Sequence, residues 1–156
     1  MKHLITITLS LALATSTLSA QDTIIIHHLK TINTTGNETA PTLLNNSTLL
    51  YSHLPHDADK NGLQLTQPVM QIYTSTLDNN LLPTNSKPLQ QGLASNTHTG
   101  NTAYNPHTST LYFTRCIDTD SSTLCQIYSA KLKNKKWKSI KPLDNEVNLP
   151  NYTSTH

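Results

Sequence analysis

The chain has little charge, few aromatic side chains and few glycines. Of its 156 residues, 13% are charged and 5% aromatic, and only four are glycine, whereas Thr, Asn and Ser abound. This composition disfavours long helices, because threonine loses side-chain freedom in a helix and Asn and Ser compete for its backbone hydrogen bonds. We therefore expect strands joined by polar turns, with asparagine in many left-handed turn positions that glycine would otherwise occupy.

Several functional signatures are also missing. No serine lies in a Gly-x-Ser-x-Gly elbow, and the two cysteines are neither spaced as Cys-x-x-Cys nor numerous enough to hold a structural zinc ion. The net charge is +2, and the only basic cluster is typical of a solvated hairpin tip, with nucleic-acid binding as the weaker alternative because no basic-aromatic platform accompanies it. The sequence thus predicts neither a catalytic site nor nucleic-acid binding. The cluster comprises Lys131, Lys133, Lys135, Lys136 and Lys138.

The first twenty residues have the pattern of a secretory signal. Lys2 and His3 precede a mostly apolar run at 4–14, and small residues follow as far as Ala20. The run is too short and too rich in hydroxyls to span a membrane, and a buried N-terminal strand is the alternative. We expect a signal peptide at 1–20, an exported chain and no transmembrane helix, since no later apolar segment is long enough.

Two stretches of the chain are copies of one another. The segments 35–37, 47–52, 71–75 and 87–89 align with 99–101, 109–114, 126–130 and 141–143, respectively. The offset drifts from 64 to 54, so the differences in length are confined to loops. A repeat of roughly 55–65 residues built from short strands predicts propeller blades or a related stacked sheet.

Each copy is expected to form four antiparallel strands. They lie at 39–43, 48–53, 69–77 and 82–89 in the first copy and at 101–105, 110–116, 124–132 and 136–142 in the second. Asn134 and Lys135 make a tight hairpin turn, and Leu82 takes the place of Trp137. The residues expected to pack the sheets are Tyr51, Ile72, Tyr73, Tyr112, Phe113, Ile127, Tyr128 and Trp137.

The resulting organisation is an incomplete ring of blades. Residues 1–20 form the signal peptide, 21–34 a strand and linker, 35–98 and 99–147 the two repeats, and 148–156 the start of a third. A closed propeller needs at least four blades. The chain is therefore expected to be a fragment of a longer product, and the alternative is that its two sheets stack with a partner.

Cys116 and Cys125 flank the loop between two strands expected to be neighbours. In an oxidising export compartment, a disulfide closing this loop is the natural interpretation. Such a bond would contribute about 2–3 kcal/mol to stability by the chain-entropy relation.

One loop resembles part of a calcium site. Asp57, Asp59 and Asn61 alternate ahead of Gly62, as in the first half of a calcium loop, but Pro68 stands where the bidentate acid belongs. A hydrated turn is favoured over a weak Ca²⁺ site, and no other cofactor is expected. The corresponding loop of the second copy holds Asp118, Asp120 and Ser122.

Two histidines lie beside this loop. His53 and His56, together with Asp57, are a further candidate for binding a transition metal. The eight histidines of the chain are otherwise scattered, without a pair at helical i, i+4 spacing.

The second copy resembles a known family. Its segments 110–115 (Thr-Leu-Tyr-Phe-Thr-Arg), 125–132 (Cys-Gln-Ile-Tyr-Ser-Ala-Lys-Leu), 134–138 (Asn-Lys-Lys-Trp-Lys) and 141–143 (Lys-Pro-Leu) are similar to WD-repeat-like, TolB-type propeller repeats. Such repeats occur in exported envelope proteins of the Bacteroidetes, often ahead of an OmpA-like peptidoglycan-binding domain. The likeness covers 35–156, but the usual Ser-Pro-Asp-Gly turn and the OmpA-like domain are absent.

The resemblance implies a non-catalytic interaction scaffold in the periplasm or at the outer membrane. Its partners would be envelope proteins, secretion components or the cell wall. Two alternatives remain open. One is a fragment of a propeller hydrolase or lyase whose active site needs further blades, and the other is a calcium-stabilised module that binds carbohydrate or peptide.

Overall fold

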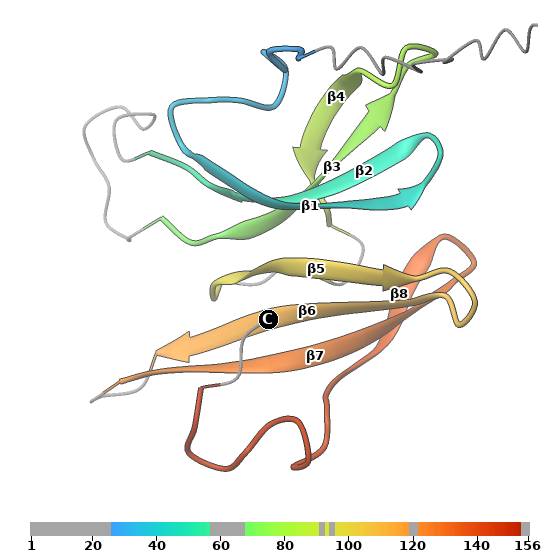
Figure 1. Ribbon diagram of the computed structural model, residues 1–156. Helices are drawn as coiled ribbons and strands as arrows, with labels where there is room; N and C mark the ends of the chain where they lie inside the picture. The colour runs from blue at the N-terminus through green and yellow to red at the C-terminus, as the bar shows by residue number, and fades with distance from the viewer. Residues whose placement is uncertain (1–25, 57–67, 91–92, 94–95, 119–121, 154–156) are drawn as a thin grey trace, which may run out of the picture.

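A computed structural model describes residues 26–56, 68–90, 93, 96–118 and 122–153, and all regular structure in this part of the chain is β-strand (Figure 1). The first sheet contains β1 (Asn37–Asn45), β2 (Thr48–Leu54), β3 (Gln71–Leu77) and β4 (Pro83–Pro88). The second contains β5 (Thr99–Asn105), β6 (Thr110–Asp118), β7 (Thr123–Lys133) and β8 (Lys136–Pro142). Both sheets are antiparallel and follow chain order, so the expected all-β fold with two four-stranded sheets is confirmed. The expected signal peptide at 1–20 lies outside the described residues.

Asparagine takes several left-handed backbone positions, as the shortage of glycine predicts. Of the nine non-glycine residues with positive φ in the described segments, four are asparagines: Asn85, Asn101, Asn134 and Asn151. Asn134 and Lys135 have φ of 51° and 59° and connect β7 to β8. Two consecutive residues with positive φ form the two-residue turn whose twist matches that of the flanking strands.

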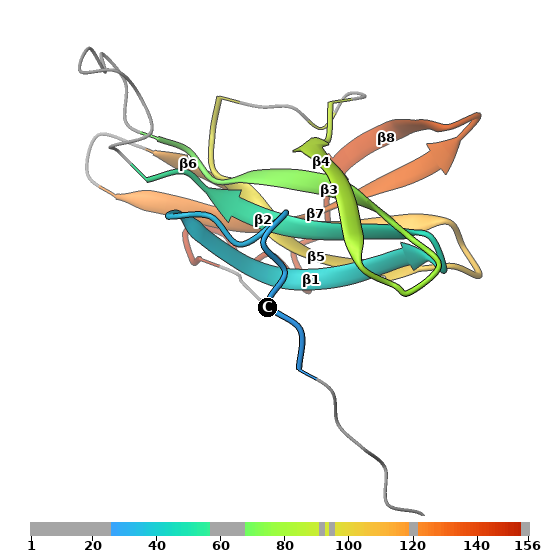
Figure 2. The same ribbon diagram turned by 90° about the horizontal axis from the view of Figure 1, so that it is seen from above.

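The two sheets are stacked, with β5 against β1, β2 and β3 (Figures 1 and 2). Side chains alternate between the two sides of a strand, so each sheet has an inner side facing the other sheet and an outer side. The inner side carries Leu50 in β2 and Phe113 in β6, both fully buried. The buried apolar core is continuous across the contact and comprises Leu50, Ile72, Leu89, Leu93, Leu111, Phe113, Ala130 and Trp137.

The sheets approach closely at Gly100 of β5. A Cβ atom there would lie 2.7 Å from Met70 Sδ and 2.8 Å from Ser52 Oγ. On either side, the Asn101 backbone N–H donates to Ser52 Oγ at 2.8 Å, and the Thr99 N–H donates to the Met70 carbonyl at 2.8 Å. The absence of a side chain at Gly100 therefore lets β5 hydrogen-bond directly to the first sheet.

The expected equivalence of Leu82 and Trp137 is wrong by one residue. Leu77 pairs with Pro83 at the end of the first sheet, as Leu132 pairs with Trp137 in the second. Pro83, which is buried, therefore occupies the position of Trp137. The connection between these paired positions is one residue longer in the first copy, a difference that sequence alignment through a turn does not reveal.

Candidate functional site

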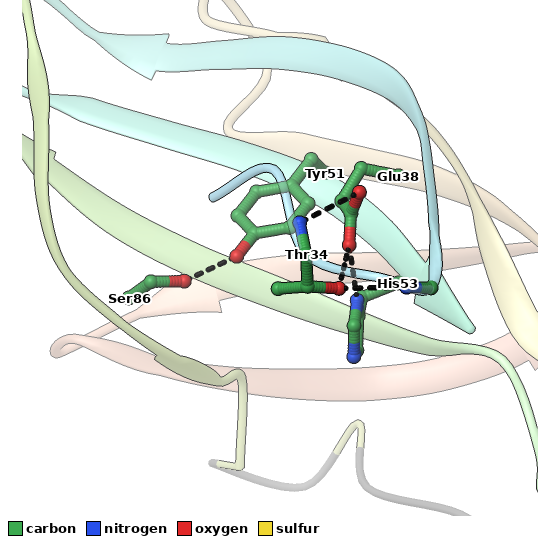
Figure 3. Close-up of polar contacts among 6 residues, drawn as sticks. Thr34, Glu38, Tyr51, His53 and Ser86 are labelled. Carbon is green, nitrogen blue, oxygen red and sulfur yellow. Dashed lines mark hydrogen bonds and ion pairs between the residues drawn. The ribbon is translucent and has the colours of Figure 1, made fainter. Parts of the chain in front are cut away.

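Two titratable side chains meet on the outer side of the first sheet (Figure 3). Glu38 of β1 and His53 of β2 are direct partners in the strand pairing, and Glu38 Oε1 lies 2.8 Å from His53 Nδ1. Their side chains are only 13% and 10% exposed, respectively. The register of two adjacent strands thus brings together residues that are fifteen positions apart in the sequence.

The Glu38 carboxylate also holds the segment that precedes β1. Thr34 Oγ1 donates to Glu38 Oε1 at 2.6 Å and the Thr34 N–H to Oε2 at 3.3 Å, while the Gly36 N–H donates to Thr34 Oγ1 at 2.9 Å. Burial raises the pKa of Glu38, but the hydrogen bonds from Thr34 and His53 outweigh it and hold the pKa below its usual value. Because an ionised carboxylate only accepts hydrogen bonds, His53 Nδ1 must donate, which leaves Nε2 as the acceptor in a neutral ring.

Two tyrosines complete this cluster. The Tyr73 ring meets the His53 ring edge-on with centroids 4.7 Å apart, and it lies 5.7 Å from the Tyr51 ring. The Tyr51 hydroxyl hydrogen-bonds to Ser86 Oγ in β4. Burial raises the pKa of both phenols, so both are neutral at neutral pH.

Glu38 and His53 form a carboxylate–histidine pair, the arrangement that orients the histidine base in many hydrolases. A nucleophile would need a hydroxyl or thiol within hydrogen-bond reach of His53 Nε2. The hydroxyls drawn in Figure 3 have other partners, since Thr34 bonds to Glu38 and Ser86 to Tyr51. The contacts favour a structural role, in which Glu38 joins β1, β2 and the preceding segment.

Arg115 takes the place of His53 in the second sheet. Its guanidinium lies 5.5 Å from the Phe113 ring centroid and 5.2 Å from that of Tyr128, and these two rings are stacked at 5.8 Å. Arg115 Nη2 donates to the Leu93 carbonyl at 3.4 Å. In each sheet, then, the residue at this position contacts an aromatic ring and is linked to the segment that leads into that sheet. His53 is linked through Glu38 to Thr34, and Arg115 directly to Leu93.

Most of the metal candidates from the sequence lie in a segment that the structure does not describe. His53 is bonded to Glu38, and Asp57, Asp59 and Asn61 lie outside the described residues. Within the described segments, no group of three His, Cys, Asp or Glu side chains is placed to hold a metal ion. The partner that the structure shows for His53 is Glu38, which becomes apparent only once the pairing of β1 with β2 is known.

The expected disulfide is present. Cys116 and Cys125 are direct partners in the β6–β7 pairing and are bonded with an S–S distance of 2.00 Å. Cys116 points to the opposite side of β6 from Phe113 and Arg115, so the bond lies on the outer side of the second sheet.

The residues expected to pack the sheets divide among three surfaces. Ile72, Phe113 and Trp137 belong to the core between the sheets, and Tyr128 packs against this core. The Trp137 ring meets the Tyr104 ring edge-on, with centroids 6.3 Å apart. The remaining four are outer-side residues: Tyr51 and Tyr73 on the first sheet, and Tyr112 and Ile127 on the second.

Comparison of the chain with family models, curated proteins and solved structures gives no significant match. The described residues include no helix with the length and hydropathy of a membrane span.

Proposed function

We propose that this chain is an exported, non-catalytic interaction scaffold in which the two sheets are consecutive propeller-type blades. Its partners are envelope proteins or cell-wall components. The main support is the way in which the two sheets pack. The side of the first sheet that carries Leu50 packs on the side of the second that carries Phe113. In the repeat alignment Phe113 corresponds to Tyr51, which lies on the other side of the first sheet from Leu50, so the sheets meet through non-equivalent sides. Stacking of equivalent sheets through unlike sides is the arrangement that propellers repeat around their axis.

The stack presents one surface suited to binding. The turns between β1 and β2, β3 and β4, β5 and β6, and β7 and β8 lie at the same end of the sheets (Figure 2). They comprise residues 46–47, 78–82, 106–109 and 134–135. Asn45 Oδ1 accepts from the Ser47 N–H at 2.8 Å, Asp78 Oδ1 from the Leu82 N–H at 2.8 Å, and Asn105 Oδ1 from the His107 N–H at 3.0 Å. Turns stabilised by their own side chains lose little conformational freedom on binding, which favours a rigid docking surface.

Export is supported by two observations. The first twenty residues have the pattern of a secretory signal, and the Cys116–Cys125 disulfide fits an oxidising compartment. If export removes the signal, N-terminal sequencing of the mature chain is expected to begin at Gln21. An uncleaved chain with reduced cysteines would contradict the proposal.

Photo-crosslinking in the source cell tests the docking surface. A benzophenone amino acid replaces Asn46 or Lys136, both exposed at the turn end, and Ile117, which is 46% exposed at the opposite end, serves as the control. We expect adducts to an envelope protein or to peptidoglycan from the two turn positions and none from the control. Equal adducts from all three positions, or only adducts of the chain with itself, would reject the proposed partners.

The proposal assigns no role to calcium. An ion that binds only the folded state raises the melting temperature, and its removal lowers it. Without such an ion, a calcium chelator is expected to change the melting temperature by less than about 1 °C. A calcium-dependent rise that disappears in Asp57→Ala/Asp59→Ala would instead favour the calcium-stabilised binding module.

A further inference from the structure

The hairpin of β7 and β8 carries its lysines on one side. Leu132 of β7 pairs with Trp137 of β8, and both side chains pack in the core between the sheets. The neighbouring positions on either side of this pair are lysines on both strands. Because side chains alternate along a strand and paired residues share a side, these lysines lie on the outer side of the second sheet. They form two directly opposed pairs, Lys131 with Lys138 and Lys133 with Lys136.

A fifth lysine lies on the same side. Lys141 of β8 pairs with Ser129, which precedes Lys131 by two residues on β7. No Asp or Glu occurs at 121–143, and the described part of the chain contains no ion pair to any of these lysines. Lys131 is half-buried and its Nζ donates to the Thr108 carbonyl at 3.0 Å, while the other four are exposed. We call this set the lysine face: Lys131, Lys133, Lys136, Lys138 and Lys141.

The hairpin does not need these charges in order to form. In the first sheet, Thr76 pairs with Thr84 at the position that Lys131 and Lys138 hold in the second. Thr84 Oγ1 donates to the Thr76 carbonyl at 3.1 Å, so threonine supports the same pairing without a charge. Like charges directly opposite each other on adjacent strands destabilise a sheet. The second sheet therefore keeps its opposed lysine pairs at a cost in stability.

Protection of a sheet edge does not explain the lysine face. Lysines on an edge strand keep other chains from pairing with it, and β8 is an edge strand of the second sheet. However, Lys131 and Lys133 belong to β7, which is paired on both sides. Solvation of the turn does not explain it either, since Lys141 lies near the other end of β8. The arrangement points instead to a partner of opposite charge.

We propose that the lysine face docks on the negatively charged headgroups of a phospholipid bilayer. Protein interfaces are enriched in arginine and aromatic side chains and depleted of lysine, whereas this face has no arginine. Single-stranded nucleic acids stack on aromatic platforms, but Tyr128 and Trp137 of this hairpin pack toward the core. Lysine is a point charge on a flexible stem without a fixed donor geometry, which suits a fluid surface of many phosphate groups.

Vesicle binding of the oxidised, exported chain tests the proposal. The vesicles contain phosphatidylcholine with about 30 mol% phosphatidylglycerol, and each lysine near such a surface contributes about fivefold to the partition coefficient. The variant Lys131→Thr/Lys138→Thr takes its side chains from the first sheet and is expected to bind about 25-fold more weakly. The matched control Lys30→Thr/Lys87→Thr removes the same charge at two exposed positions elsewhere, and we expect a change of less than about threefold.

Three further measurements separate docking from a structural role. Lys131→Arg/Lys138→Arg keeps the charge and is expected to keep the binding. Raising the salt from about 0.05 M to about 0.5 M is expected to release the wild-type chain, because salt screens exposed charges. The threonine variant is expected to unfold at a higher urea concentration than the wild type, since it loses an opposed pair of like charges.

Near-UV circular dichroism of the buried Trp137 checks that each variant folds. If Lys131→Thr/Lys138→Thr loses this signal, Lys138→Thr/Lys141→Thr replaces it, because both of these side chains are exposed.

Three results would overturn the inference. One is equal binding to vesicles of phosphatidylcholine alone, and another is an equal loss of binding in the matched control. The third is a preference for polyglutamate or a single-stranded oligonucleotide over the vesicles at equal concentration of negative charge. The inference goes beyond the proposed scaffold and does not rest on it, so crosslinks from Asn46 would still support the scaffold after any of these results.

Discussion

Removing the disulfide tests how far loop closure stabilises the second sheet. Cys116 and Cys125 are nine residues apart and pair directly across β6 and β7. For a loop of this length, the chain-entropy relation gives about 2.7 kcal/mol at 25 °C. With an unfolding entropy of about 2.1 cal/mol/K per residue, this corresponds to a fall of about 8 °C in melting temperature for a 156-residue chain. The double variant Cys116→Ser/Cys125→Ser is expected to show this loss while keeping the strand pairing.

Urea unfolding followed by far-UV circular dichroism measures the effect. Wild-type protein with a reductant provides the matched control, and it is expected to unfold at the same midpoint as the double variant without it. Reductant is expected to leave the double variant unchanged. If the double variant lies within about 0.5 kcal/mol of the oxidised wild type, the β6–β7 pairing already constrains the unfolded chain and the loop-closure reasoning fails.

Further substitutions test other contacts, all by urea unfolding. Gly100→Ala places a methyl group against Met70 and Ser52 and is expected to cost about 1–3 kcal/mol, whereas an unchanged midpoint would show that the sheets do not approach there. Glu38→Gln is expected to lose about 1–2 kcal/mol at pH 7. Because folding lowers the pKa of Glu38, its extra stability is present above the ordinary value of 4.5 and disappears as the pH falls through the lower folded value. If Glu38→Gln lowered the free energy of unfolding by the same amount at pH 7 and at pH 3, this explanation would be wrong. Leu81→Asn is expected to stabilise the protein by about 0.5 kcal/mol, because the exposed leucine has a φ of 60° that asparagine tolerates better. A loss of stability would instead show that the leucine makes a contact that matters.

Local patterns were enough to predict the number and type of elements. The aligned segments 47–52 and 109–114 each hold a short apolar run bounded by Ser and Thr, and they became parts of β2 and β6. Asn134 and Lys135 formed the tight turn because asparagine accepts a positive φ at little cost. Where the alignment crossed a turn of unequal length, at Leu82, it failed by one residue.

The Glu38–His53 pair could not be found in this way. A one-residue slip in the β1–β2 register would move His53 from opposite Glu38 and leave every local pattern intact. The same holds for Arg115, since its position between aromatic rings and the Leu93 carbonyl depends on which side of the second sheet meets the first.

By itself, the order of residues determined an all-β chain with two matching copies, because short apolar runs, turn chemistry and the repeated segments can be read from neighbouring positions. Only the tertiary structure decided that equivalent sheets meet through unlike sides, so that Leu50 of the first sheet and Phe113 of the second belong to one core. Both sides of each sheet carry apolar residues, so the choice between them depends on shape and on the close approach at Gly100, which exist only once the sheets have packed.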